Sequence, residues 1–242
     1  MLEAAFWGFV GGAALLIGAT FALTVRTSQR TIGLVMAFGA GVLVSALAFE
    51  LTAESFERGG TPAVALGLAA GGISFFAGDW LLDHRGGDHR KRSGGEQEGG
   101  AAGAIVLGAL MDGIPESVAI GVSLLAGGKV GVATVAAVFL SNIPESLSAA
   151  TGLRAAGHSR RWILMLWAAV ALVSAVAAAI GYSALGHASP VLIGFIQAFA
   201  AGAILTMLAD TMMPEAFAHG GKLVGLLTLL GFALSFLLSN AG

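Results

Sequence analysis

The chain has 242 residues, of which 57% are hydrophobic and 11% are charged, and its formal net charge is −2. A soluble domain of this length could not bury so much apolar surface, so the composition predicts a polytopic membrane protein. The absence of cysteine excludes disulfides and thiolate metal ligands. The small net charge is uninformative about nucleic acid, and we expect no nucleic-acid partner.

Eight apolar stretches are long enough to cross a hydrocarbon core of roughly 30 Å, which requires about 20 helical residues. We therefore predict an all-α fold, with one transmembrane domain over residues 1–242. The start of the chain lacks a basic segment, so we expect the first stretch to be a retained helix. The predicted spans are 4–25, 32–51, 63–82, 101–125, 130–152, 162–185, 191–213 and 223–238.

One long polar segment, residues 83–100, separates the third and fourth spans, and its glycines and charges predict a flexible loop. The odd-numbered loops carry all the Lys and Arg residues except Arg58 and Lys129. By the positive-inside rule these loops, including 83–100, are cytoplasmic and both termini lie on the other side. We expect a multi-pass protein of the cell (inner) membrane.

An internal repeat relates residues 37–56 to residues 198–217, at an offset of 161. The offset joins span two to span seven, and these two spans cross the membrane in opposite directions. The repeat predicts an inverted-topology arrangement, with spans one to three related to spans six to eight around the central pair, spans four and five. The alternative is that membrane helices rich in Gly and Ala resemble each other by chance.

The central pair carries two related motifs. Residues 113–117 read Gly-Ile-Pro-Glu-Ser and residues 142–146 read Asn-Ile-Pro-Glu-Ser. A carboxylate at bilayer depth is costly, and a proline there removes a backbone hydrogen bond, so neither is expected in a span that serves only as an anchor. The doubled motif predicts one site built from two helices.

Helical spacing gathers further polar groups at this site. Asp112 lies one turn before Glu116, and Ser141 one turn before Glu145, while Asn142 occupies the position that Gly113 holds in the other motif. Neither span has a Lys, Arg or His near the acids, which leaves a bound cation or shared protons as the compensating charge. The alternative is that both glutamates are protonated and only link the two helices.

Other acids are open to two interpretations. Glu50 and Asp210 are either further ligands or helix-end residues in polar surroundings. Glu54, Glu57 and Glu215 lie at predicted span ends, where solvated carboxylates are ordinary, although a funnel for cations would also place acids there.

These spans and motifs resemble the ZIP (Zrt/Irt-like) divalent metal transporters over essentially the whole chain. The resemblance implies alternating access by an elevator-like movement, in which spans one, four, five and six carry the metal against spans two, three, seven and eight. It also implies a main metal site and a second one beside it, and it places Glu50 where the family often has a histidine. The implied ligands are Asp112, Glu116, Ser141 and Glu145 for the main site, with Gly113 and Asn142 at the positions of the second.

The chain departs from the family pattern in three places. The span-four core of the family commonly reads His-Asn-x-Pro-Glu-Gly, whereas Asp112 and Gly113 stand here for His and Asn, and span six has no acid. We therefore expect one principal site made of oxygen ligands, which takes zinc first and also admits manganese, iron or cadmium. We expect no cofactor, because the metal is cargo, and the sequence leaves a homodimer open.

Two other functional classes use acids within the membrane. A cation channel, or a proton-linked carrier of another solute, would need the same residues. An intramembrane enzyme is disfavoured because the chain lacks a Gly-x-Gly-Asp pattern, a phosphate cradle and a His-Glu-x-x-His motif. We predict a transporter and no enzymatic activity.

Overall fold

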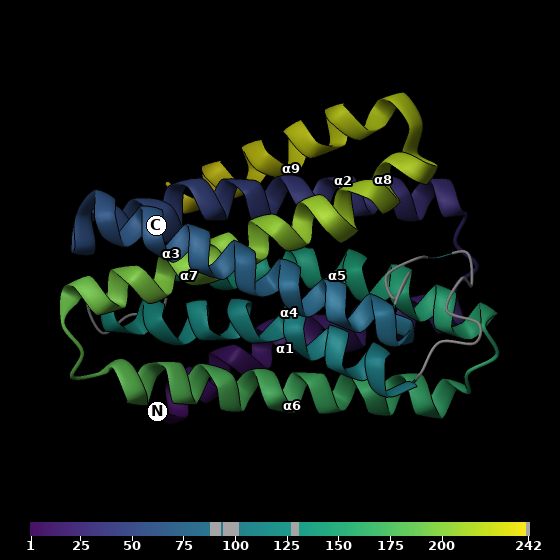
Figure 1. The fold of residues 1–242 in the computed structure, drawn as a ribbon. Helices are drawn as coiled ribbons and strands as arrows, with labels where there is room; N and C mark the ends of the chain where they lie inside the picture. The colour runs from purple at the N-terminus through teal and green to yellow at the C-terminus, as the bar shows by residue number, and fades with distance from the viewer. Residues whose placement is uncertain (88–92, 94–101, 127–130, 241–242) are drawn as a thin grey trace.

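The computed structural model describes residues 1–87, Ser93, 102–126 and 131–240, and every regular element in these ranges is helical. Most of the predicted flexible loop, residues 83–100, lies outside the described residues. The α-helices are shown in Figure 1. They are α1 (Leu2–Thr24), α2 (Gln29–Ala46), α3 (Ala53–Leu82), α4 (Ala102–Ser123), α5 (Val132–Ala155), α6 (Arg160–Leu185), α7 (Pro190–Met207), α8 (Met213–Gly220) and α9 (Val224–Ser239).

Short helical turns connect several of these helices. The π-helices η1 (Leu47–Thr52) and η4 (Leu208–Met212) join α2 to α3 and α7 to α8, and a third, η2 (Asp83–Gly87), follows α3. The 3-10 turns η3 (Leu124–Ala126) and η5 (Gly221–Leu223) follow α4 and α8. Within the described residues, six helical stretches are long and apolar enough to cross a membrane.

Serine caps begin three of the helices. The hydroxyl oxygens of Ser28, Ser159 and Ser189 accept hydrogen bonds from backbone N–H groups in the first turns of α2, α6 and α7. Each cap satisfies one of the donors that a helix leaves open at its start. The caps explain why these helices begin one to three residues before the first residue of the predicted apolar span.

Two helices are longer than predicted. The sequence suggested a connection over residues 52–62, but α2, η1 and the first part of α3 run on without a break as far as Gly60. Gly60 has φ 66° and ψ −173°, and Gly221 after α8 has φ 63° and ψ −150°. Only glycine adopts this backbone geometry readily, so the chain turns back at the second residue of each Gly-Gly pair.

The helices form two bundles that meet along the middle of the molecule. The first bundle comprises α1, α4, α5 and α6, in which α1 packs against α5 and α6, and α4 packs against α6. The second bundle comprises α2, α3, α7, α8 and α9, in which α3 packs against α7, and α2 against α8 and α9. The main contacts between the bundles are α2 with α5 and α4 with α7, so α4 and α5 lie centrally (Figure 1).

The two copies of the sequence repeat have matching local structure. The π-helices η1 and η4 begin 161 residues apart, at Leu47 and Leu208, and the positive-φ glycines Gly60 and Gly221 show the same offset. A Cβ on Gly33 would lie 2.8 Å from the nitrogen of Gly220, and a Cβ on Gly194 would lie 2.8 Å from the oxygen of Ser55. Close backbone contact at these glycines therefore recurs in α2 against α8 and in α7 against α3.

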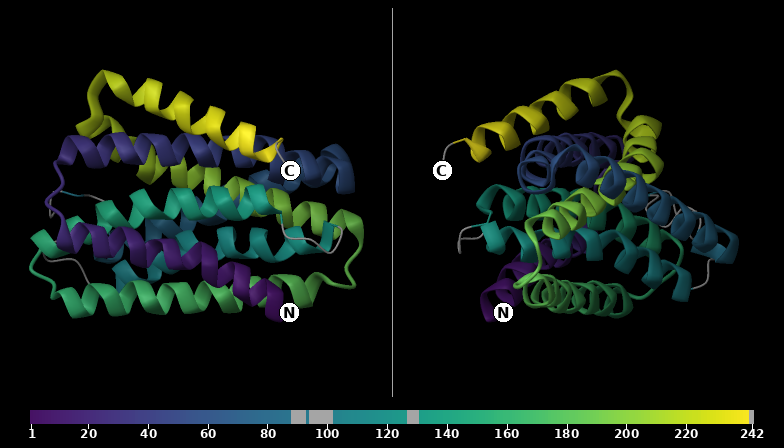
Figure 2. Two further views of the ribbon diagram at one scale, coloured as in Figure 1. Left: turned by 180° about the vertical axis from the view of Figure 1, so that it is seen from behind. Right: turned by 60° about the vertical axis from the view of Figure 1, so that its left-hand side comes forward.

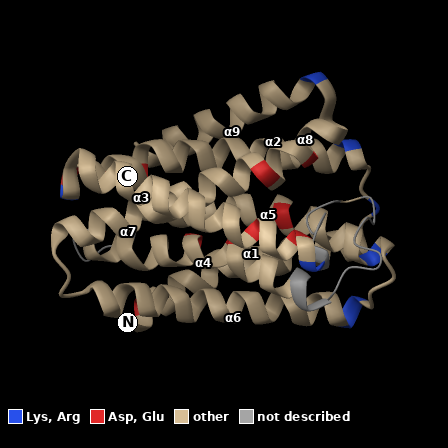
Figure 3. Cartoon of the chain, viewed as in Figure 1, with Lys and Arg blue, Asp and Glu red and all other residues tan. Residues whose placement is uncertain are grey.

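The two ends of the molecule differ in charge. The start of α1 and the end of α9 lie at one end, which we call the terminal end (Figure 2). Lys and Arg gather at the opposite end, which we call the basic end (Figure 3). The described basic residues at this end lie after α1, α3 and α8, in the last turn of α5 and in the first turns of α2 and α6: Arg26, Arg30, Arg85, Arg154, Arg160, Arg161 and Lys222. Arg58 instead lies beside the Gly60 turn.

Candidate functional site

The acids of the first motif lie on a buried face of α4. Asp112 is 2% exposed and Glu116 is 1% exposed. Pro115 is inside the helix, and Ser117 donates its hydroxyl to the carbonyl of Gly113 at 2.6 Å. The helix is therefore continuous through the proline, and its two carboxylates, one turn apart, are both withdrawn from the surface.

The second motif lies on α5 in a similar environment. Ser141 and Asn142 are buried, and Glu145 is 3% exposed. The amide nitrogen of Asn142 donates to the carbonyl of Gly11 on α1 at 3.0 Å, and the Ser141 hydroxyl donates to the carbonyl of Val138 at 3.0 Å. The Asn142 contact ties α5 to α1 and sets the rotation of the helix that presents Glu145.

Small residues on α1 and α2 let α5 approach closely. A Cβ on Gly11 of α1 would lie 3.3 Å from Cγ1 of Val138, and a Cβ on Gly39 of α2 would lie 2.6 Å from Cγ of Pro144. Side-chain carbons rarely come so close. The second motif is thus packed on one side against its own bundle and on the other against a glycine of the second bundle.

The remaining predicted ligands lie elsewhere. Glu50 is in the π-helix η1, half-buried, and its Oε1 accepts a short hydrogen bond from the Ser239 hydroxyl at the end of α9. Asp210 is in the π-helix η4 and is exposed. In this conformation the Glu50 side chain is held within the second bundle. π-Helical turns such as η1 and η4 are frequent at functional sites.

Five of the seven predicted ligands are buried on the two central helices. Within the part of the chain that the structure describes, no group of three or more His, Asp or Glu side chains is arranged to hold a metal ion. Asp112, Glu116, Ser141, Asn142 and Glu145 share burial on the two central helices, whereas Glu50 and Asp210 do not join them there. The predicted ligands are divided between a buried central set and two outlying acids.

Apolar side chains close the central helices toward the terminal end. Ala119 lies one turn beyond Glu116, and beside it a cavity of about 10 Å³ is no larger than one water molecule. The lining comes from α2, η1, α4, α5 and α7: Leu43, Ala46, Leu47, Leu51, Ala119, Thr134, Val138 and Ile204. The cavity in this layer is too small to hold a hydrated ion.

Glu215 on α8, assigned by the sequence to a solvated span end or a funnel, is fully buried at 0% exposure. Its Oε1 accepts hydrogen bonds from the backbone N–H of Ser93 at 2.9 Å, the Ser93 hydroxyl at 2.5 Å and the Ser148 hydroxyl at 3.2 Å. His219 Nε2 lies 3.6 Å from the same oxygen. Because Ser148 is on α5, Glu215 links the two bundles near the basic end.

Glu54 occupies the repeat position that corresponds to Glu215, near the terminal end. The Gln197 amide nitrogen donates to Glu54 Oε2 at 2.5 Å, and Arg58 Nη2 lies 4.0 Å from the same oxygen. Ser55, which is fully buried, donates its hydroxyl to the carbonyl of Gly194 at 2.7 Å. The Gly-Gly pairs and the offset of the repeat are the sequence signals that could have located both acids at equivalent helix ends.

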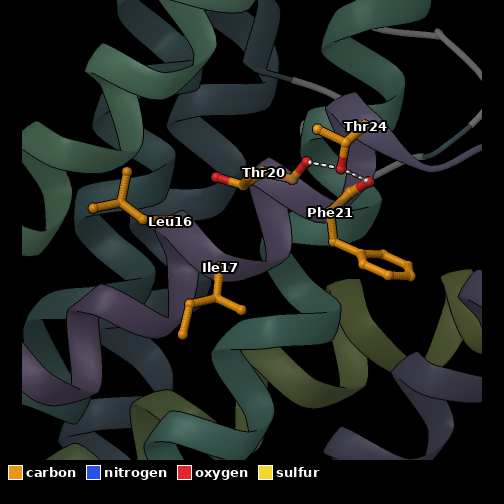
Figure 4. A pocket seen from close by; sticks show the side chains of 5 residues that line it. All are labelled: Leu16, Ile17, Thr20, Phe21 and Thr24. Atoms are coloured by element: carbon orange, nitrogen blue, oxygen red, sulfur yellow. Dashed lines mark hydrogen bonds between the residues drawn. The ribbon is translucent and has the colours of Figure 1, made fainter.

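A larger hollow of about 390 Å³ has none of these acids in its lining (Figure 4). All of its lining residues belong to α1: Leu16, Ile17, Thr20, Phe21 and Thr24. The Thr24 hydroxyl donates to the carbonyls of Thr20 at 2.8 Å and Phe21 at 3.3 Å, so its polar group is satisfied within the helix. A hollow lined by a single helix is an irregularity of the outer surface and offers no acidic ligand.

The chain matches the model of a known family. The profile described as "ZIP Zinc transporter" matches residues 83–239, which include both Pro-Glu motifs, α8 and α9. A comparison with curated proteins finds no match. The profile covers more than half of the chain, and the helical architecture and buried acids agree with it, so this protein belongs to the ZIP zinc transporter family.

Proposed function

We propose that the protein moves divalent metal cations through a site between α4 and α5 by alternating access, with zinc as the first candidate and manganese, iron or cadmium as others. Membership of the family implies divalent metal transport. The metal is the cargo of the protein. The location of the site, the identity of the metal and the movement are the parts that we propose.

The observation that carries the proposal is the burial of the central carboxylates. Asp112, Glu116 and Glu145 are each at most 3% exposed, on two helices that lie in the middle of an apolar bundle. Carboxylates at such a position are costly, and in membrane proteins they commonly mark the pathway of an ion or substrate. We assign the metal to these three acids together with Ser141 and Asn142. Glu50 and Asp210 remain predicted ligands that would contribute in another conformation.

We further propose eight crossings with inverted repeats. The turns at Gly60 and Gly221 divide the two longest helical stretches, and α1 begins at the same end at which α9 finishes, as an even number of crossings requires (Figures 1 and 2). The shared offset of the π-helices and of the Gly33 and Gly194 contacts supports the repeat. The basic end is then cytoplasmic, and the terminal end lies outside.

The proposed movement is a displacement of the first bundle against the second. All the assigned ligands belong to the first bundle, and the helices of each bundle pack mainly against one another. The apolar layer around Ala119 closes the outer side of the site in this conformation. A shift of α4 and α5 relative to α2 and α7 would move the acids past that layer while the helices remain intact.

We expect one principal metal ion because α6, which borders the site at Gly113, supplies no carboxylate. A Cβ at Gly113 would lie 3.7 Å from the hydroxyl of Ser174 and 3.7 Å from a methyl group of Val170, both on α6. The position at which the family commonly has an asparagine is a glycine here, and a side chain on it would meet the Ser174 hydroxyl at van der Waals distance. The oxygen ligand set fits zinc and also manganese or iron.

The test is metal uptake by the purified protein in liposomes, with Zn²⁺, Mn²⁺, Fe²⁺ and Cd²⁺ as separate substrates. We expect saturable uptake that falls by roughly a hundredfold in Glu116→Gln and in Glu145→Gln, since a contact to a charged group is worth about 3 kcal/mol. Glu3→Gln, which removes an exposed carboxylate of α1, is the control and should retain full uptake. Unsaturable ion flux would favour a channel, and a folded protein that moves none of the four ions would refute metal transport.

A further inference from the structure

Gln197 is a buried amide that the central site does not use. The side chain is 1% exposed on α7, near the terminal end. Its nitrogen donates a hydrogen bond to Glu54. An ionised carboxylate can only accept, so the amide places its donor, the nitrogen, toward Glu54. Among the described residues, the other atom of the amide, Oε1, has no hydrogen-bond partner. Leaving a buried acceptor without a partner is unfavourable, so this oxygen calls for an explanation.

The internal repeat shows that helix packing does not require an amide here. The position that corresponds to Gln197 in the other copy is Met36, which is fully buried on α2. The backbone contacts around both residues are equivalent, since Gly33 meets α8 as Gly194 meets α3. The equivalent position of the other copy is therefore filled by an apolar side chain. Packing alone does not explain why the side chain at Gln197 is an amide.

Glu54, which bonds to this amide, and Arg58, which lies beside Glu54, both reach the surface. The Glu54 side chain is 30% exposed and that of Arg58 is 20% exposed, so the carboxylate is open to ions from the terminal end. The guanidinium lies 4.0 Å from the carboxylate oxygen, which is a long and weak contact. A divalent cation carries twice the charge of this guanidinium and could displace it from Glu54.

We propose that Glu54 and Gln197 form a second, outer cation site, at which a divalent metal ion is captured before it reaches the central helices. Glu54 supplies a carboxylate, and the Gln197 oxygen accepts a hydrogen bond from the hydration shell of the ion or binds it directly. Arg58 occupies the carboxylate until the ion arrives. This inference rests on the proposed function and on the orientation with the terminal end outside.

The test measures KM and the maximal rate of uptake in liposomes. A change in KM reports on capture of the ion, and a change in the maximal rate reports on its movement. Glu54→Gln should raise KM about tenfold and Gln197→Met about fivefold, with the maximal rate unchanged, since the central site remains intact. Arg58→Gln should lower KM about threefold, because it removes the competing cation. Gln197→Met is the matched variant for folding, because it installs the side chain found at the equivalent position of the other copy.

Glu57→Gln is the matched charge control, since it removes a carboxylate from the same helix but from an exposed position. We expect its KM to stay within about twofold of the original protein, as is typical of an exposed charge. Equal shifts in Glu54→Gln and Glu57→Gln would reduce the effect to general surface charge and overturn the site. A loss of maximal rate with unchanged KM would assign Glu54 a purely structural role and also overturn it.

A failure of the proposed function gives a different result. In that case the original protein moves no divalent ion at all, and the outer site is decided by calorimetric titration of Zn²⁺ and Mn²⁺ into the purified protein. Binding that weakens about tenfold in Glu54→Gln but not in Glu57→Gln would support the site. Identical binding in all three proteins would refute it.

Discussion

Gly39 lies where the two bundles meet, and its replacement by alanine tests whether that interface must stay free to move. The added Cβ would lie 2.6 Å from Cγ of Pro144, 3.4 Å from Cε of Met212 and 3.4 Å from Cα of Ser141. Carbon atoms pack best at about 3.5–4.0 Å, so α5 would have to retreat by about 1 Å. The proline ring is rigid and cannot move out of the way by changing its rotamer. Overpacking of this kind costs about 1–3 kcal/mol.

A cost of that size corresponds to about a 5- to 150-fold change in an equilibrium between two arrangements of the bundles. We expect Gly39→Ala to reduce the maximal rate of uptake by a factor in this range and to lower the melting temperature in detergent. Gly113→Ala is the control, because its nearest contacts, with Ser174 and Val170, would be at 3.7 Å and the substitution adds the same methyl group to a central helix. Unchanged uptake and melting temperature in Gly39→Ala would contradict the packing argument.

Two further predictions concern the turns and the number of metals. Gly60→Ala and Gly221→Ala should each destabilise the protein by about 1–3 kcal/mol, because their backbone geometry is strained for any other residue. Differential scanning fluorimetry should show a lower melting temperature for both, and not for Gly225→Ala, whose Cβ would meet open space within helix α9. Gly113→Asn combined with Ser174→Asp should raise the number of bound Zn²⁺ ions from one to two, as counted by calorimetry, since the two positions face each other across α4 and α6. A stoichiometry that stays at one would show that the serine is not the group that limits the site.

The membrane class and most helix positions could be predicted from the sequence. In lipid every backbone polar group must be satisfied within the chain, so long apolar stretches have to be helical. The prediction of an all-α polytopic protein is confirmed in that form, and the ZIP resemblance is confirmed by the family match. The connection expected after Leu51 is instead helical as far as Gly60, because nothing in the local sequence ends a helix before the Gly-Gly pair.

The candidate site could be predicted only in part. The motifs on α4 and α5 indicated buried acids, and Glu116 and Glu145 are indeed buried. Their assignment as metal ligands stays a prediction. The sequence could not show that Glu50 bonds to Ser239, since that contact joins η1 to the last residue of α9, 189 positions away.

What the sequence determined by itself is the set of features that depend on local chemistry: membrane insertion, helix formation, the proline-glutamate motifs and the repeat. What only the tertiary structure decided is how these features meet. Glu54 and Glu215 occupy the same repeat position, yet one binds Gln197 and the other Ser93 and Ser148. The physical reason is that a side chain's burial and partners are set by the helices packed against it, and those helices come from distant parts of the chain.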